Sequence, residues 1–97
     1  SLIKDGRRSG GRLVNLYYLP AAQGTGAVGF TTVKKLRRAV DRNRARRLLR
    51  EVFRIRQLNF RKGNDYLFQW KGEVSGRSYA DAEADIMNIM GKEGLLQ

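Results

Sequence analysis

Residues 29–54 read GFTTVKKLRRAVDRNRARRLLREVFR, and this stretch decides the fold. Within it, apolar side chains recur at the i, i+3, i+4, i+7 and i+8 spacing of one helix face: Ala45, Leu48, Leu49, Val52 and Phe53. The spacing predicts a helix over residues 41–56, with Asp41 as its N-cap. The apolar stripe would pack against the rest of the domain.

A second face of this helix is basic. Arg42, Arg46, Arg50 and Arg54 recur every four residues, and Arg47 lies beside them. A guanidinium group can hold a phosphate through two parallel hydrogen bonds, so arginine suits nucleic acid better than general solubility. The sequence therefore predicts a helix that packs with one side and binds a polyanion with the other.

The net charge of the chain belongs to the segment around this helix. The 97 residues include 20 Lys and Arg and 9 Asp and Glu, a formal charge of +11. Residues 34–62 hold thirteen of the basic residues and only two acids, while the remaining chain holds seven of each. Such a one-sided distribution indicates a surface that binds a polyanion.

Histidine and cysteine are both absent. Their absence excludes disulfides and thiolate zinc sites, and it removes the commonest acid-base group at neutral pH. The acids Asp81, Glu83 and Asp85 are the candidates for metal-assisted hydrolysis. Acids near the start of a helix complement its dipole, and we expect that role for them instead. A small domain without cysteine fits a reducing compartment, so we expect a cytoplasmic protein.

Strands are expected on both sides of the helix. Residues 12–19 would form a strand with Val14, Leu16 and Tyr18 on its buried face and Asn15 and Tyr17 on a partly exposed face. Residues 27–33 would pair with this strand as a hairpin. The glycine-rich residues 6–11 would be a flexible lead-in.

The C-terminal third predicts one more strand and one more helix. Residues 65–71 alternate, with Tyr66, Phe68 and Trp70 on one face. Ser78 and Asp81 form a variant of the capping box at the start of a helix that would end at Gly91. The expected architecture is an α+β sandwich, with a right-handed crossover as the default.

The basic helix with its preceding lysine pair resembles the signature of the bacterial ribonuclease P protein subunit. In that family a strand ending in two lysines precedes an R-N-R-x-[KR]-R-x-x-R-E helix, and here residues 42–51 read RNRARRLLRE after Lys34 and Lys35. The resemblance extends to the GRR at residues 6–8 and covers nearly the whole chain. It implies one ribonuclease P protein domain over residues 1–97.

The resemblance also implies a fold and a function. The fold is α+β: a small two-layer sandwich of three to four strands flanked by helices, with a left-handed βαβ crossover (ribosomal protein S5 domain 2-like). The function is that of the RNA-binding subunit of ribonuclease P, which removes the 5′ leader from precursor tRNA. The RNA subunit would hold the catalytic Mg²⁺, and the protein would supply no catalytic residue and no metal ligand. The implied partners are ribonuclease P RNA and the leader, without a membrane or an obligate protein partner.

Site residues follow from the resemblance position by position. Tyr17 matches an aromatic position that stacks on the leader. The family usually opens with a longer first helix that forms one wall of the leader cleft, and only five residues precede Gly6 here, so we expect that wall to be largely missing. The residues matching the RNA-binding positions are Lys34, Lys35, Arg42, Asn43, Arg44, Arg46, Arg47 and Arg50.

Three other functions remain open on the residues alone. A structural RNA-binding protein of the ribosome would have similar charge and size. A freestanding metal-dependent nuclease would use Asp81 and Asp85. A basic amphipathic helix on an anionic membrane is disfavoured, because the apolar stripe is needed for the domain core. For Tyr17, ordinary cross-strand packing is as compatible with the sequence as base stacking.

Overall fold

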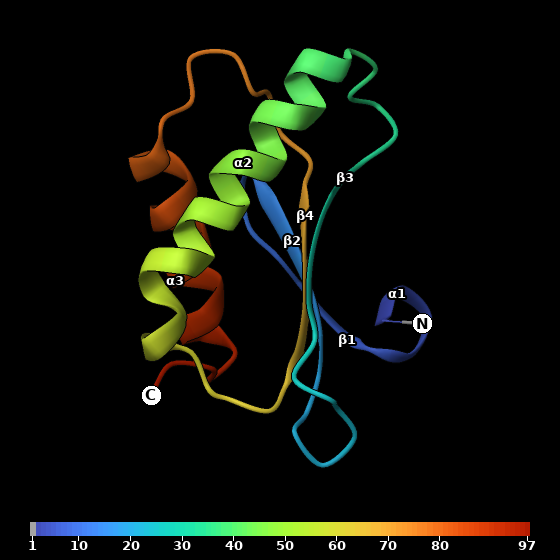
Figure 1. The fold of residues 1–97 in the computed structure, drawn as a ribbon, viewed down its shortest axis with the longest axis vertical. Helices are drawn as coiled ribbons and strands as arrows, with labels where there is room; N and C mark the ends of the chain where they lie inside the picture. The colour runs from blue at the N-terminus through green and yellow to red at the C-terminus, as the bar shows by residue number, and fades with distance from the viewer. Residues whose placement is uncertain (1) are drawn as a thin grey trace.

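The computed structural model describes residues 2–97, which form one four-stranded sheet with helices on both faces (Figure 1). The sheet order is β1-β2-β4-β3, helices α2 and α3 cover one face, and α1 lies on the other side. The elements are α1 (Leu2–Asp5), β1 (Arg7–Gly10), β2 (Val14–Leu19), β3 (Val28–Thr32), α2 (Ala39–Arg56), the 3₁₀ turn η1 (Gln57–Asn59), β4 (Asp65–Trp70) and α3 (Tyr79–Lys92).

The predicted hairpin is wrong, because β4 lies between β2 and β3. Phe68 of β4 is opposite Leu16 in an antiparallel pairing and opposite Phe30 in a parallel one. β4 alternates strictly between buried and half-buried residues, whereas every residue of β3 is half-buried. Placing β4 between two strands buries its aromatic face, and this burial outweighs the short connection that favoured a hairpin.

The crossover from β3 through α2 to β4 is left-handed, as the resemblance implied. In Figure 1 the chain rises along β3 in front, descends through α2 on the left and rises again along β4 behind. The default right-handed expectation from local pattern is therefore wrong for this unit. This crossover places α2 directly over the sheet, with one flank next to β3.

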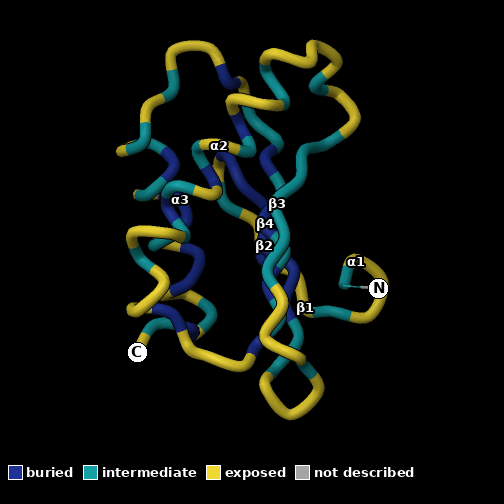
Figure 2. The backbone as a smooth tube through the Cα atoms, in the orientation of Figure 1, coloured by how far each residue is buried: buried dark blue, intermediate teal, exposed yellow. Residues whose placement is uncertain are grey.

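The predicted stripe of α2 fixes the core. Ala45, Leu49 and Val52 are fully buried, and Figure 2 shows buried backbone where the helices meet the sheet. Fully burying a side chain the size of Leu or Val stabilises a fold by about 1.5–3 kcal/mol. The prediction of Asp41 as N-cap is wrong: the helix begins at Ala39, Arg38 is the N-cap residue three positions earlier, and Asp41 lies in the first turn. There the carboxylate complements the helix dipole.

The capping box of α3 is confirmed. Ser78 Oγ accepts a hydrogen bond from the Asp81 backbone N–H, and the Asp81 carboxylate accepts one from the Ser78 N–H at 2.9 Å. The helix continues to Lys92, beyond the predicted end at Gly91. Gly94, at a φ of 70°, provides the left-handed residue that follows it.

Asp85 joins α3 to the start of β2. Its buried carboxylate accepts hydrogen bonds from the backbone N–H groups of Arg12, Leu13 and Val14, each at 2.9 Å. A Cβ on Gly11 would lie 2.5 Å from Asp85 Oδ2, so glycine is needed for this approach. Residues 6–11 are therefore a paired strand and an anchored turn, and the prediction of a flexible lead-in is wrong.

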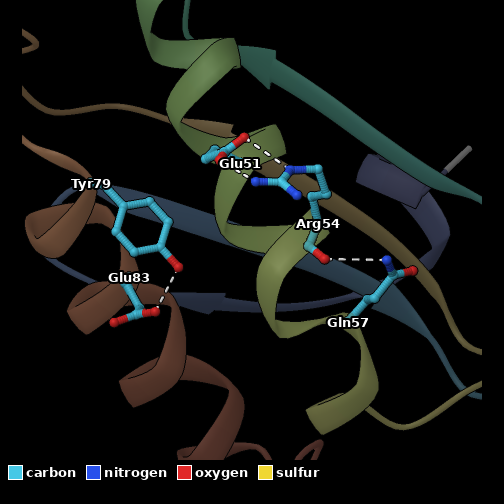
Figure 3. Close-up of polar contacts among 5 residues, drawn as sticks. All are labelled: Glu51, Arg54, Gln57, Tyr79 and Glu83. Carbon is cyan, nitrogen blue, oxygen red and sulfur yellow. Dashed lines mark hydrogen bonds and ion pairs between the residues drawn. The ribbon is translucent and has the colours of Figure 1, made fainter.

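Glu83 links α3 to α2. Its carboxylate accepts hydrogen bonds from Arg56 Nε at 2.8 Å and from the Tyr79 hydroxyl at 2.6 Å, the second of which is drawn in Figure 3. The bond from Arg56, followed by that from Tyr79, holds the pKa of Glu83 below its ordinary value of 4.5. The ionised form of Glu83 is thus favoured by folding.

We expect Asp85→Asn to lower the free energy of unfolding by about 2–4 kcal/mol. The amide keeps one acceptor oxygen and places an NH₂ group against buried N–H donors, and losing hydrogen bonds to a charged group costs about 1.5–3 kcal/mol. Urea denaturation measures the change. Glu73→Gln is the control, because Glu73 is exposed, and an equal loss in both variants would contradict the role given to Asp85.

We expect the stability difference between wild type and Glu83→Gln to depend on pH. Because folding lowers the pKa of Glu83, its stabilising contribution is complete above the ordinary value of 4.5 and is lost as pH falls through the lowered folded-state pKa. Melting temperatures recorded from pH 7 to pH 3 should show a gap at neutral pH that closes in acid. A gap that widened in acid would contradict this expectation.

Candidate nucleic-acid interface

Three arginines line the flank of α2 that faces β3. Arg42, Arg46 and Arg50 follow each other at one-turn intervals, about 6 Å apart along the helix axis. The guanidinium of Arg50 lies over the Phe30 ring of β3, 5.7 Å from its centroid. We call these three residues the arginine row. Because the stripe of α2 is fixed on the sheet, the row runs along the edge of the helix beside β3.

The positive charges of Arg46 and Arg50, the second and third members of the row, are not offset by a carboxylate in the part of the chain that the structure describes. Arg46 donates a hydrogen bond to Asn43 Oδ1 at 2.7 Å, and the guanidinium of Arg50 lies over the neutral ring of Phe30. Within residues 2–97, neither forms an ion pair with a carboxylate. The predicted open basic face is therefore present at these positions.

The positive charge of Arg54, the fourth residue of the predicted series, is offset by an ion pair. Its guanidinium pairs with the Glu51 carboxylate, as Figure 3 shows. The hydrogen bond between them lowers the pKa of Glu51 and raises that of Arg54. Arg54 was not among the predicted RNA-binding residues, and its ion pair marks the end of the open basic series.

Arg42 organises the basic connection that precedes α2. Its Nη1 donates to the backbone oxygens of Leu36, at 3.1 Å, and Arg37. Lys34 and Lys35 lie in the turn directly after β3 and are both exposed. The structure thus places the lysine pair near the N-terminal end of α2, where the arginine row begins.

Arg44 faces the other flank of α2. Residues two apart on a helix do not share a face, and the Arg44 guanidinium donates to the backbone oxygen of Arg77, just before α3. Arg47 is exposed on the solvent side between the two flanks. The eight residues predicted to bind RNA therefore do not form a single face.

Tyr17 is buried, in contrast to the predicted partly exposed face. It is 9% exposed, and its hydroxyl donates to Gln69 Oε1 at 3.4 Å. Asn15, on the same face, is 5% exposed and donates to the same oxygen at 3.0 Å. The difference arises because β1 extends the sheet beside β2, and α1 packs against β2 and β4. Residues 6–11 are rich in glycine and lack the alternating apolar residues of a strand, so the sequence pattern did not predict β1.

The acids of α3 are engaged within the fold. Asp81 caps its helix, Glu83 binds Arg56 and Asp85 binds backbone N–H groups. Among residues 2–97 no group of three or more carboxylates is arranged to hold a metal ion. In the same part of the chain, no helix combines the length and apolar character needed to cross a bilayer.

Sequence and structure comparisons agree on one family. The family model Ribonuclease P matches residues 1–94. The ribonuclease P protein component of Pelotomaculum thermopropionicum is 33% identical, over 90% of this chain and 78% of that protein. The ribonuclease P protein component of Syntrophomonas wolfei is also 33% identical, over 98% of this chain and 80% of that protein.

Solved structures show the same fold. The RNase P protein of Thermotoga maritima superposes with a TM-score of 0.80 at 18% identity, covering 94% of this chain and 86% of that one. The Staphylococcus aureus protein gives 0.79 at 18% identity, covering 99% and 88%. With the family match over residues 1–94, these observations establish that the chain belongs to the ribonuclease P protein family.

Proposed function

We propose that this chain is the RNA-binding protein subunit of ribonuclease P, which assists endonucleolytic removal of the 5′ leader from precursor tRNA. The observation that carries the proposal is the open charge of Arg46 and Arg50, one helical turn apart and without a carboxylate partner in residues 2–97. Like charges at this spacing repel each other in the free protein. A phosphate backbone on this flank would relieve that repulsion.

In the proposed enzyme the RNA subunit carries out the chemistry with Mg²⁺ that it holds itself. The protein would contribute affinity and position. This division of labour is supported by the sequence, which contains no histidine, and by the engagement of the α3 acids in the fold. The absence of cysteine fits the reducing cytoplasm, where we place the partnership.

The proposed contacts fall into three groups. The arginine row, with Asn43 and the lysine pair Lys34 and Lys35, would bind ribonuclease P RNA along the β3 flank of α2. Arg44 and Arg47 would meet RNA from the α3 side and the solvent side of the helix. Tyr17 would stack on the leader only after α1 moves away from the sheet, because its ring is covered in the structure.

We expect Arg46→Gln and Arg50→Gln each to weaken binding to ribonuclease P RNA and to flatten its salt dependence. Each phosphate contact contributes roughly 0.7–0.9 to the slope of log affinity against log salt. Filter binding between about 50 and 200 mM KCl measures the slope. Arg54→Gln is the matched control, since it removes the same charge from a residue already paired with Glu51. Equal slopes for wild type and the two row variants would exclude the row from the interface.

We expect the chain to restore leader cleavage by ribonuclease P RNA at a magnesium concentration too low for the RNA alone. The protein without RNA should cleave nothing, and the Asp81→Asn variant should restore cleavage like wild type. Product sizes on precursor tRNA with a labelled 5′ end give the readout. Binding without restored cleavage would favour a structural role of the ribosomal kind, and cleavage by protein alone would indicate a nuclease.

A further inference from the structure

A pocket of about 260 Å³ lies at the C-terminal end of α2, between the loop after η1 and the start of β3. Three aromatic residues line it: Phe53 is half-buried, while Phe60 and Tyr66, at 2% and 3% exposed, form the floor beneath it. The Phe60 ring lies 5.9 Å from that of Phe53 and 6.4 Å from that of Tyr66, so the rings form one connected cluster. The volume is below the roughly 300–1,000 Å³ of most small-molecule sites, which suits a single heterocyclic ring.

The polar groups of this pocket are cationic or neutral. Arg61 and Lys62 line it and are exposed, and its lining residues include no carboxylate. Arg61 is held in place because its Nε donates to the Gly94 backbone oxygen at 3.0 Å. The exposed amide of Gln57 also lines the pocket; its Nε2 donates to the Arg54 backbone oxygen at 3.2 Å, and its oxygen can accept from the edge of a base. The amide of Asn64 is buried and donates to the Tyr66 hydroxyl at 3.1 Å. The half-buried ring of Phe53, the amide of Gln57 and the two cations have the chemistry to bind a base together with its phosphate.

The pocket continues the arginine row. Phe53 lies one turn after Arg50 on the same flank of α2, and Gln57 follows the helix as its C-cap and the first residue of η1. Phe53 and Arg50 also contact the same ring, that of Phe30. A strand of RNA following the row toward the C-terminal end of α2 would therefore reach the pocket directly.

We propose that this pocket receives one unpaired base of the bound RNA, while Arg61 and Lys62 hold the adjoining phosphate. The inference rests on the proposed function, because the row delivers the strand to the pocket. A second copy of this chain is the other candidate, given the exposed Leu58 at the rim. Charge complementarity favours RNA, since the same rim on a second copy would bring Arg61 and Lys62 toward like charges.

The test uses adenosine 5′-monophosphate as a minimal nucleotide and ribose 5-phosphate as the same ligand without a base. Titrations of the ¹⁵N-labelled chain are followed by NMR. We expect adenosine monophosphate to shift the amides of Gln57, Gly63 and Asn64 at least about fivefold more than ribose 5-phosphate at equal concentration, because only the nucleotide has a base that reaches the ring of Phe53. Equal shifts with both ligands would show binding of charge alone and overturn the proposal.

Leu58→Glu and Ile55→Glu form a matched pair of variants. Both residues are exposed and apolar, at 74% and 48%, and both substitutions add one negative charge, but only Leu58 lines the pocket. We expect Leu58→Glu to weaken binding of adenosine monophosphate by about tenfold and Ile55→Glu by less than about twofold, since only the first places a carboxylate beside the phosphate. Equal weakening would assign the effect to long-range charge and sink the proposal.

Two further outcomes separate the alternatives. Shifts of the pocket amides that grow with protein concentration, in the absence of nucleotide, would show that a second copy occupies the pocket and overturn the proposal. The proposed function is tested independently by the row variants on ribonuclease P RNA. If those variants flatten the salt dependence while adenosine monophosphate leaves the pocket amides unchanged, the function stands and the pocket proposal fails.

Discussion

Burial of Ala45, Leu49 and Val52 against the aromatic face of the sheet is the interaction on which the rest depends. It fixes the rotation of α2 about its own axis, and every other side chain of the helix then has a set direction. Arg46 and Arg50 extend along the flank beside β3, while Arg44 extends toward α3. A helix rotated by a fraction of a turn would bury guanidinium groups and expose the stripe, and both changes are unfavourable.

Three of the nine acids of this basic chain stabilise backbone groups. Asp65 accepts from the N–H groups of Thr25 and Ala27 at 2.7 and 2.9 Å, and these bonds lower the pKa of Asp65. Asp81 and Asp85 likewise bind backbone N–H groups. These three carboxylates stabilise a loop, a helix end and the start of a strand, and they form no ion pair with Arg46 or Arg50 in residues 2–97. The fold thereby gains charge-assisted hydrogen bonds, and Arg46 and Arg50 keep their unbalanced charge.

Local pattern predicted the parts of the fold that depend on neighbours in sequence. The stripe of α2, the alternation of β4 and the capping box at Ser78 each show in the order of residues within one segment, and all are present. The strand order and the burial of Tyr17 depend on pairing with distant segments, which periodicity does not encode. Arg44 was grouped with its neighbours by the family motif, yet a spacing of two residues alone shows that it cannot share their face.

The basic residues of α2 differ in how strongly the free protein orients them. Arg42 and Arg44 donate to backbone oxygens, which are neutral, so each guanidinium is held in place and still carries its full charge. An arginine side chain has about 2 kcal/mol of rotamer entropy to lose when it is fixed. For these two residues folding has already restricted that freedom, so ordering them against RNA costs less at the moment of binding. Arg54 is oriented as well, but by a carboxylate that cancels its charge. Orientation by carbonyl oxygens rather than by acids is therefore what lets a folded basic helix be both rigid and attractive to phosphate.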